Sequence, residues 1–213
     1  MTNPKTRIRF DMARTSGIDN HHILGQVTCV TRRRLNKPQI SPKFENNLSC
    51  QTYGKSDNIA DVKLIDFDFY SDDGGDFHEI VRLTGNRASF LEGFEIRQIN
   101  RSRFNPGLVK AFHLHMNQDE VWAVHPLDRL LVGLLDARNG SQTEGLSMRF
   151  VMGGGKSKFL YIPRGVAHGG MVLGGNPVDV IYLVNQLFSP DNPDEWRLPW
   201  DILGKDFWEL SKG

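Results

Sequence analysis

The sequence predicts an all-β sandwich or barrel that extends from about residue 61 toward the C-terminal end. Three observations lead to this fold class. Short segments of alternating or β-branched apolar residues recur, they are spaced by about 8–12 residues, and Gly- or Pro-containing turns separate them. The sequence has no convincing repeat and no long amphipathic helix. We therefore expect β-strands packed in layers around one core.

The predicted strands follow one another along the chain. Residues 62–69 and 95–100 alternate apolar with polar side chains, as half-buried strands do. Residues 178–184 are rich in valine, which favours strands. Further strands are expected at residues 121–124, 129–136, 146–152 and 159–162. The expected turns are residues 72–75, 138–141, 153–155 and 163–165. We expect a short helix after Trp196 that closes one end of the barrel.

Residues 1–58 differ from the rest and are predicted to be an N-terminal extension of a domain formed by residues 59–213. Prolines and an arginine run interrupt any periodicity in the extension, and only Val27–Val30 is expected to form a strand. Because exposed sheet edges are usually paired or covered, we expect a homodimer. The extension is expected to contribute to the dimer contact.

Composition excludes several classes of function. Lys and Arg number 26 against 25 Asp and Glu, and the net charge of +1 argues against nucleic-acid or anionic-membrane binding by bulk electrostatics. The longest apolar run, Leu130–Leu135, is far shorter than the ~20 residues of a membrane span. Two cysteines do not make a disulfide framework, and residues 1–20 lack the apolar region of a secretory signal. We expect a cytoplasmic protein without nucleic-acid or membrane partners.

Histidines and one glutamate form the most informative pattern. His113 and His115 are two residues apart, so in a strand their side chains share one face. Glu120 follows five residues later, and His168 follows the turn at residues 163–165. Together with Gly107, this order resembles the two-motif signature of the cupin superfamily. The resemblance implies a double-stranded β-helix, or jelly roll, whose members are either metal-binding or metal-free.

The region from Asp61 onward also resembles the dTDP-4-dehydrorhamnose 3,5-epimerase family, which is a group of jelly-roll nucleotide-sugar epimerases. The strongest similarity is at residues 162–169, which read Ile-Pro-Arg-Gly-Val-Ala-His-Gly. The other matching segments are Asp72–Glu79, Gln98–Ser102, Lys110–His113, Asp136–Gly145 and Tyr182 with Ser189-Pro190. The resemblance covers about 150 residues and implies an all-β cupin-type jelly roll with an N-terminal extension and a short C-terminal helical tail.

The resemblance implies a substrate, a reaction and a set of catalytic residues. The substrate is a nucleotide-linked 4-keto-6-deoxyhexose, and one proton is removed and returned at C3, at C5 or at both. His113 is the expected base, because histidine titrates near neutral pH. Asp206 is expected to orient His113, and Tyr182 to act as the acid on the opposite face of the sugar. No cofactor and no metal are expected.

Six further residues are expected to contact the substrate. They are Gln98, Asn100, Lys110, His115, Glu120 and His168. Glu120 stands near the position where the family has a lysine that stabilises the enolate. Two alternatives remain open on the residues alone. One is a metal-dependent cupin enzyme with His113, His115, Glu120 and His168 as ligands, and the other is a catalytically silent, sugar-binding cupin.

Overall fold

The computed structural model describes residues 39–50 and 57–210. The chain divides into two units, residues 1–52 and residues 53–213, whereas the sequence analysis placed the boundary after residue 58. The described part of the first unit contains the short helix α1 (Pro42–Glu45), which buries no residue. The strand predicted at Val27–Val30 lies outside the described residues. Within the described ranges, no helix has the length and apolarity needed to cross a membrane.

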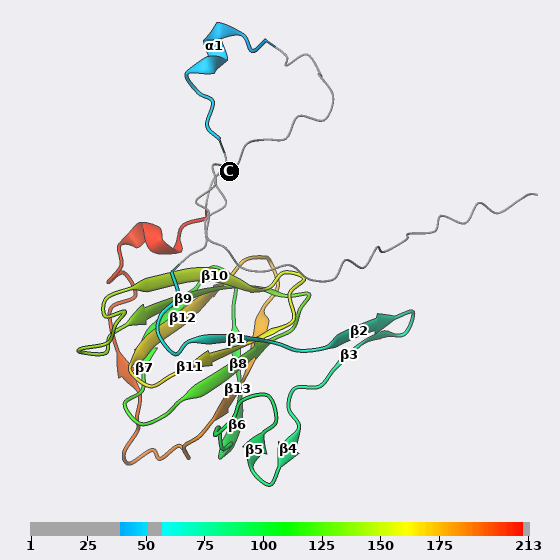
Figure 1. Ribbon diagram of the computed structural model, residues 1–213, viewed down its shortest axis with the longest axis vertical. Coiled ribbons are helices and arrows are strands. Elements are labelled where there is room, and N and C mark those ends of the chain that lie inside the picture. Colours follow the sequence, from blue (N-terminus) through cyan, green and yellow to red (C-terminus); the bar gives the residue numbers. More distant parts are fainter. Residues whose placement is uncertain (1–38, 51–56, 211–213) are drawn as a thin grey trace, which may run out of the picture. The chain divides into compact units, whose positions relative to one another are not determined.

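The second unit is a sandwich of two five-stranded antiparallel sheets, which confirms the predicted all-β jelly roll (Figure 1). The first sheet has the order β1 (Lys63–Asp66), β11 (Lys158–Ile162), β8 (Glu120–Val124), β13 (Val178–Val184), β6 (Gln98–Phe104). The second has the order β10 (Ser147–Gly153), β9 (Arg129–Asp136), β12 (Val166–Val172), β7 (Val109–Leu114), β14 (Trp196–Arg197). Apart from the β9–β10 hairpin, successive strands from β6 to β14 alternate between the two sheets, so His113 and Glu120 reach the interior from opposite layers.

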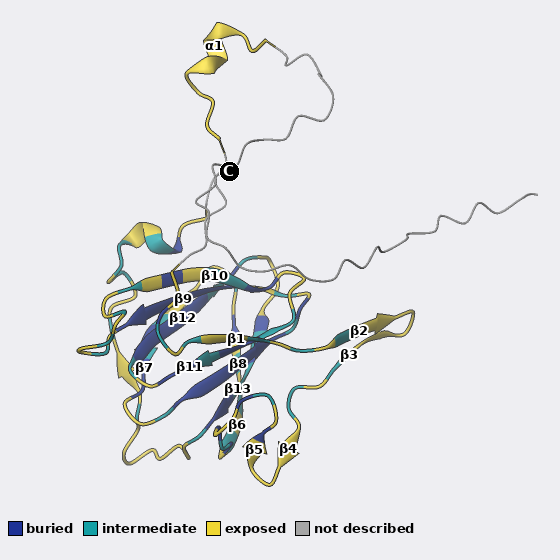
Figure 2. Cartoon of the chain, viewed as in Figure 1, coloured by how far each residue is buried: buried dark blue, intermediate teal, exposed yellow. Residues whose placement is uncertain are grey.

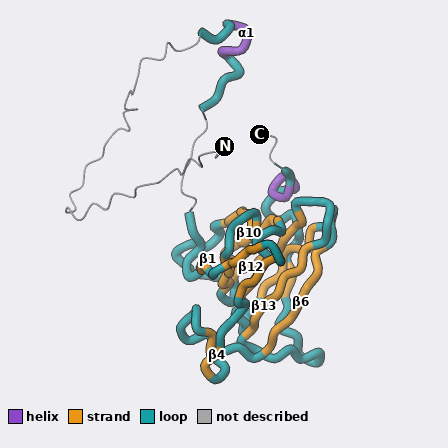
Figure 3. Tube along the Cα trace, turned by 90° about the vertical axis from the view of Figure 1, so that its right-hand side faces the viewer, coloured by secondary structure: helices purple, strands orange, loops and turns teal. Residues whose placement is uncertain are grey.

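Two small hairpins and one 3-10 helix complete this unit. The hairpins are β2 (Phe69–Asp72) with β3 (Gly75–His78), and β4 (Leu83–Thr84) with β5 (Arg87–Ala88). The β2–β3 hairpin extends away from the sandwich in Figure 1. Turned by 90°, Figure 3 shows β4 and the C-terminal 3-10 helix η1 (Lys205–Trp208) on opposite sides of the sandwich.

Strand β9 is buried on both of its faces, as Figure 2 shows by its colour. Leu130, Val132 and Leu134 are fully buried in the core between the two sheets. Leu131 and Leu135 point to the other face, where they pack in a cluster with Phe112 and Trp208. Because both faces are covered, this strand is apolar throughout rather than alternating. The continuous apolar run in the sequence therefore marks the centre of the second sheet.

The strands predicted at residues 129–136 and 178–184 have the observed bounds of β9 and β13. The single strand predicted at residues 62–69 is instead divided between β1 and β2. Strand β12 was not predicted, because Gly169 and Gly170 weaken its β-signal. The contacts explain one of these glycines: a Cβ on Gly169 would lie 2.3 Å from the Ala111 Cβ of β7. The glycine lets β7 and β12, which carry His113 and His168, approach closely.

The predicted C-terminal helix exists as η1, but it does not close an end of the barrel. Phe207 and Trp208 of η1 pack against Phe112 on the outer face of the second sheet. The Trp208 indole nitrogen donates a hydrogen bond to the Trp200 carbonyl oxygen at 2.9 Å. The apolar side chains of η1 thus cover the sheet on the side opposite to His113.

Asp136 is the centre of a buried hydrogen-bond network at the end of β9. Its carboxylate accepts hydrogen bonds from Arg138 (2.8 Å from Nε), Ser141 (2.6 Å) and Thr143 (2.7 Å). The Arg138 guanidinium also donates to the Ala60 carbonyl oxygen at 2.8 Å, and so ties the start of the unit to β9. Arg138 is the main cause of a pKa for Asp136 far below its usual range; the Ser141 and Thr143 hydrogen bonds add to it, and burial opposes it.

We expect Asp136→Asn to lower the free energy of unfolding by about 2–4 kcal/mol at pH 7, because Arg138 loses its charged partner. The depressed pKa means that this stabilisation is present above the unfolded-state pKa of about 3.9 and is lost as the pH falls below it. Urea unfolding at pH 7 and at pH 3 should therefore show a smaller difference between variant and parent at the lower pH. An equal difference at both values would contradict the ionic role of Asp136.

Candidate active site

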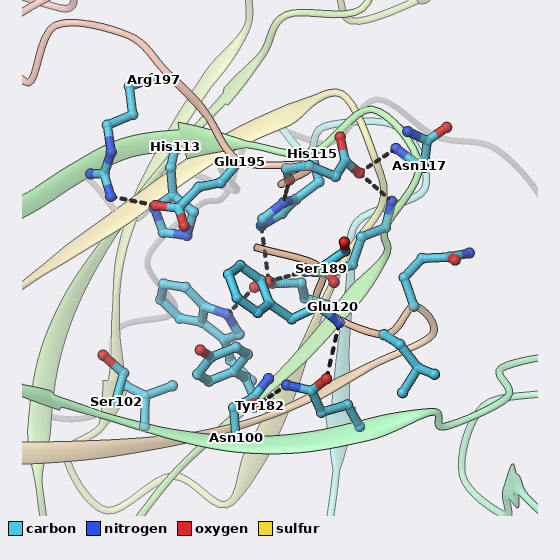
Figure 4. Close-up of a pocket in the computed structure, with 18 of the residues that line it drawn as sticks. Asn100, Ser102, His113, His115, Asn117, Glu120, Tyr182, Ser189, Glu195 and Arg197 are labelled. Carbon is cyan, nitrogen blue, oxygen red and sulfur yellow. Dashed lines mark hydrogen bonds and ion pairs between the residues drawn. The ribbon is translucent and has the colours of Figure 1, made fainter. Parts of the chain in front are cut away.

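A cavity of about 650 Å³ opens between the two sheets and contains most of the predicted site residues. Its walls come from β6, β8 and β13 of one sheet, from β7 of the other, and from the segment between β13 and β14 (Figure 4). Polar side chains predominate at its surface. The chemistry of the site therefore depends on which groups each sheet directs into this cavity.

The second sheet contributes three histidines. His113 lies in β7, and His115 is the first residue after the end of that strand. His168 lies in β12, where it is paired in register with His113. The ring centroids of His113 and His168 are 4.1 Å apart, and those of His113 and His115 are 5.6 Å apart. The odd-numbered residues of β7 face the interior because Phe112 and Leu114 pack on the outer face. Alternation along β7 thus gathers the imidazoles.

The first sheet contributes Glu120, whose side chain is almost completely buried. Two neutral donors orient its carboxylate: Gln118 donates to Oε1 at 2.8 Å, and the Trp122 indole donates to Oε2 at 2.6 Å. The same two oxygens face Nε2 of His115 at 3.0 Å and Nε2 of His168 at 3.3 Å. Glu120 therefore lies between two histidines and is fixed from the other side.

Backbone carbonyl groups fix the orientation of two of the histidines. Nδ1 of His168 donates to the Val166 carbonyl oxygen at 2.9 Å, and Nδ1 of His115 donates to the Asp194 carbonyl oxygen. Since a carbonyl oxygen only accepts, the proton of each neutral ring is on Nδ1. Each Nε2 is buried and faces an oxygen of the Glu120 carboxylate, to which it donates when the ring is protonated.

The charges of Glu120 and His115 stabilise each other. Burial alone would raise the pKa of Glu120, but hydrogen bonds and charge interactions with His115 and His168 hold it well below its usual range. Burial likewise opposes protonation of His115, yet the contact with Glu120 and the Asp194 carbonyl leaves the pKa of His115 raised. The carboxylate is thus ionised and attracts positive charge to the floor of the cavity.

His113 and Tyr182 are both uncharged, but His113 can accept a proton whereas the Tyr182 hydroxyl can donate one. Burial, followed by the neighbouring His168, lowers the pKa of His113 well below its usual value, so the ring is neutral at neutral pH. Burial, followed by the charge of Glu120, raises the pKa of Tyr182, so its hydroxyl keeps its proton. Both line the cavity, His113 from β7 and Tyr182 from β13. One wall can therefore accept a proton and the other can donate one.

The structure brings the predicted substrate-binding residues to the same cavity. Gln98, Asn100, Lys110, His115 and Glu120 line it, and His168 is buried beside it. The Gln98 amide donates to the Asn100 side-chain oxygen at 2.6 Å, and Lys110 donates to the Ser102 hydroxyl at 2.6 Å. These contacts leave one face of β6 polar toward the cavity.

Asp206 is the exception among the predicted site residues. It lies in η1, which packs on the outer face of the second sheet, whereas His113 points to the inner face. Asp206 is exposed and does not line the cavity, and within residues 57–210 the His113 ring has no hydrogen bond. The expected Asp206–His113 pair is therefore absent from the structure. The apolar contacts of Phe207 and Trp208 place the helix on the wrong side of β7 for this pairing.

Sequence reasoning missed Asp194, which organises the turn after His115. Its carboxylate accepts hydrogen bonds from three consecutive backbone amides, those of residues 116, 117 and 118, at 2.8, 2.7 and 3.1 Å. Its carbonyl oxygen holds the His115 ring. The residue comes from a segment 76 or more positions later in the chain, so no local pattern marks it. Gln118 and Trp122, which orient Glu120, were missed for the lack of any motif.

We expect Asp194→Ala to expose these three amides to solvent exchange. Each loses a charge-assisted hydrogen bond, and the protection of residues 116–118 should fall about 10-fold or more. Hydrogen–deuterium exchange with mass spectrometry measures this effect. Asp191→Ala, a change at an exposed carboxylate in the same segment, is the matched control and should leave the exchange unchanged. Unaltered protection in Asp194→Ala would show that the turn holds without this carboxylate.

Two known proteins resemble the chain over most of their own length. SpsL of Bacillus subtilis, a spore coat polysaccharide biosynthesis protein, is 42% identical over 143 residues, which cover 67% of this chain and 91% of SpsL. Agl13 of Haloferax volcanii, a probable low-salt glycan biosynthesis epimerase, is 32% identical, with 68% of this chain and 90% of Agl13 covered.

Solved structures show the same fold. A dTDP sugar isomerase from Desulfovibrio desulfuricans G20 superposes with a TM-score of 0.59 at 24% identity, covering 72% of this chain and 91% of the other. The dTDP-4-dehydrorhamnose 3,5-epimerase of Bacillus anthracis gives a TM-score of 0.58 at 22% identity, covering 74% and 90%. The family described as dTDP-4-dehydrorhamnose 3,5-epimerase matches residues 56–203, more than half of the chain. The chain belongs to the dTDP-4-dehydrorhamnose 3,5-epimerase family.

Proposed function

We propose that the protein epimerises a nucleotide-linked 4-keto-6-deoxyhexose at C3, at C5 or at both, with His113 as the base and Tyr182 as the acid. The observation that carries the proposal is that these two residues face one cavity from different sheets. The ketone at C4 acidifies the protons on its two neighbouring carbons. Inversion requires removal of a proton from one face of the sugar and return to the other.

The protonation states support these roles. A neutral imidazole takes up a proton without first losing one, and its depressed pKa means that His113 stays neutral down to pH values below the usual histidine range. The raised pKa of Tyr182 keeps its hydroxyl protonated. Both groups therefore start the reaction in the required state. Asp206 has no part in the proton transfer, since it lies on the other side of the sheet.

The rest of the cavity suits a nucleotide sugar. The amides of Gln98 and Asn100 offer hydrogen bonds to sugar hydroxyls. Lys110 and Arg197 line the same cavity and suit the two phosphates. Among the solved neighbours, the Bacillus anthracis enzyme holds TDP and PPi, and that of Legionella pneumophila holds dTDP-4-keto-L-rhamnose. The proposal includes the expected homodimer and cytoplasmic location.

The test is exchange of substrate protons with solvent. The protein is incubated in D₂O with a dTDP-linked 4-keto-6-deoxyglucose, and ¹H NMR follows the signals of H3 and H5. We expect the loss of one or both signals, together with the appearance of a product inverted at the exchanging carbon. Binding of the sugar nucleotide without any exchange would instead support the silent sugar-binding protein.

A further inference from the structure

We propose that the side-chain nitrogen of Asn100 donates a hydrogen bond to the C4 oxygen of the sugar while that oxygen carries the charge of an enolate. The inference rests on the proposed epimerisation and adds to it the group that meets the developing charge. When His113 takes the proton from C3 or C5, the electron pair of the broken C–H bond forms a carbon–carbon double bond and the C4 oxygen becomes negative. A donor that already points to this oxygen lowers the barrier, because it does not have to turn during the reaction.

Three polar side chains stand side by side on the wall of the cavity that faces the base. Tyr182 of β13 is paired in register with Trp122 of β8 on one side and with Asn100 of β6 on the other. Paired residues of neighbouring strands have their side chains on the same face, with Cβ atoms about 4.5–5.5 Å apart. All three line the cavity, where Figure 4 labels Tyr182 and Asn100. A sugar held against the Tyr182 hydroxyl is therefore within reach of both neighbours.

The β8 side of this row is unsuitable for a new negative charge. The Trp122 indole N–H is already donated to Glu120, at 2.6 Å. Glu120 is buried and ionised, and it repels a second negative charge placed close to it. The enolate oxygen is consequently favoured on the β6 side of Tyr182, where Asn100 lies.

A main-chain N–H fixes the orientation of the Asn100 amide. A backbone N–H can only donate, so the Gln98 atom that accepts from the Phe188 amide at 3.0 Å is the side-chain oxygen. The Gln98 nitrogen then donates to Asn100 at 2.6 Å, and the Asn100 atom that accepts is its oxygen. Nδ2 of Asn100 has no hydrogen-bond partner in the described part of the chain. One end of this amide is thus fixed, and the other is a free donor at the cavity wall.

The lysine and the arginine of the cavity are held by other side chains. Lys110 donates to the Ser102 hydroxyl at 2.6 Å, and Arg197 forms an ion pair with Glu195. Both belong to the second sheet, which also carries the base, and they stay available for the phosphates. A neutral donor suffices at the enolate, because His113 becomes positively charged when it takes the proton and balances part of the new charge.

Asn100→Asp tests the donor with little change of shape, because it replaces Nδ2 by an oxygen that cannot donate near neutral pH. The probe is the dTDP-linked 4-keto-6-deoxyglucose in D₂O. At saturating sugar nucleotide, loss of the H3 and H5 signals should be about 10²–10³-fold slower, the usual effect of removing one oxyanion donor. The half-saturating concentration should change much less than this rate. Parental exchange in Asn100→Asp would overturn the proposal.

Asn192→Asp is the matched control. Asn192 lines the same cavity but is exposed, in the segment between β13 and β14. The substitution adds the same negative charge near the bound diphosphate without removing a donor at the C4 oxygen. It should keep the parental exchange rate at saturation. An equal loss in both variants would assign the effect to charge alone and would also overturn the role of Asn100.

The pH dependence separates a donor from a structural residue. The carboxyl group introduced by Asn100→Asp regains a donor when it is protonated, and an aspartate titrates near pH 3.9 when nothing perturbs it. The ratio of variant to parental exchange rates should therefore rise at least about 10-fold between about pH 7.5 and about pH 5. A ratio that does not change with pH would contradict hydrogen-bond donation from this position.

Gln98→Glu tests the orientation of the amide. The introduced carboxylate still accepts from the Phe188 amide but has no N–H for Asn100, which then turns its nitrogen away from the sugar. We expect a loss of exchange of about 10²-fold. In an Asn100→Leu background no amide remains to be turned, so Gln98→Glu should change the rate by less than about 3-fold. Fully additive losses would show that Gln98 acts on the sugar directly and not through Asn100.

The outcomes for this proposal and for the proposed function are distinct. A parent protein that exchanges neither H3 nor H5 overturns the epimerase and, with it, the role of Asn100. A parent protein that exchanges, together with Asn100→Asp at the same rate, overturns only the role of Asn100. Circular dichroism and calorimetric titration with dTDP check that each variant is folded and has an intact cavity. If Asn100→Asp is unfolded, Asn100→Leu replaces it, and its exchange should likewise be about 10²–10³-fold slower.

Discussion

His113→Asn is expected to reduce deuterium exchange into the sugar by about 10²–10⁴-fold, the usual contribution of a general base. His113 is the neutral imidazole at the cavity wall, with its pKa lowered first by burial and then by His168. Asparagine keeps a polar side chain of similar reach but cannot take up a proton near neutral pH. The rate of loss of the H3 and H5 signals in D₂O measures the effect.

Asp206→Asn is the control for this experiment and should exchange at the parental rate. Asp206 and His113 belong to opposite sides of the second sheet, so the substitution does not reach the cavity. Equal exchange in His113→Asn and the parent would remove His113 as the base. A large loss in Asp206→Asn would instead mean that η1 adopts another position when substrate is bound.

Tyr182→Phe is expected to separate exchange from inversion. The base still removes a proton and returns it from the same side, so deuterium should enter the sugar. The opposite face of the sugar has lost its proton donor, however, so inverted product should form at least about 10²-fold more slowly. Phenylalanine keeps the ring volume, and the partly buried site should tolerate it. NMR of the recovered sugar nucleotide gives deuterium content and configuration together.

Tyr161→Phe is the matched control for Tyr182. Tyr161 lies in β11, is half-buried with a pKa raised first by burial, and does not line the cavity. Its loss of a hydroxyl should leave both exchange and inversion unchanged. If Tyr182→Phe inverts the sugar at the parental rate, Tyr182 is a packing residue and the acid is a water molecule or another side chain.

Local patterns predicted those parts of the fold that depend on burial. The continuous apolar run of β9 and the valine-rich β13 were placed with correct bounds because the sheets cover them. Strand β12 was not predicted because it contains glycines, of which Gly169 is required by the close approach of Ala111 from β7. That requirement is set by a neighbour distant in the chain and leaves no β-signal in the local sequence.

The candidate site shows the same division. The spacing of His113 and His115 predicted a shared face, and the structure has both rings lining the cavity. The partners of these rings were beyond the reach of sequence spacing. Asp194 contacts the turn after His115 although it is distant in the sequence. Asp206 lies on the face of the second sheet opposite to His113. Asp206 lies there because the apolar side chains of η1 pack against Phe112 on the outer face of the sheet.

In the roles proposed for His113 and Tyr182, which lie on facing sheets, the stereochemical fidelity of the reaction depends on the core between the sheets. Face-to-face sheets lie about 10 Å apart, and the side chains between them hold that spacing. Phe104 and Trp122 pack edge to face in this layer, with ring centroids 6.1 Å apart. Thinning the layer would bring donor and acceptor nearer to each other, and thickening it would leave one out of reach. The configuration of the product would therefore depend on the spacing between the two sheets.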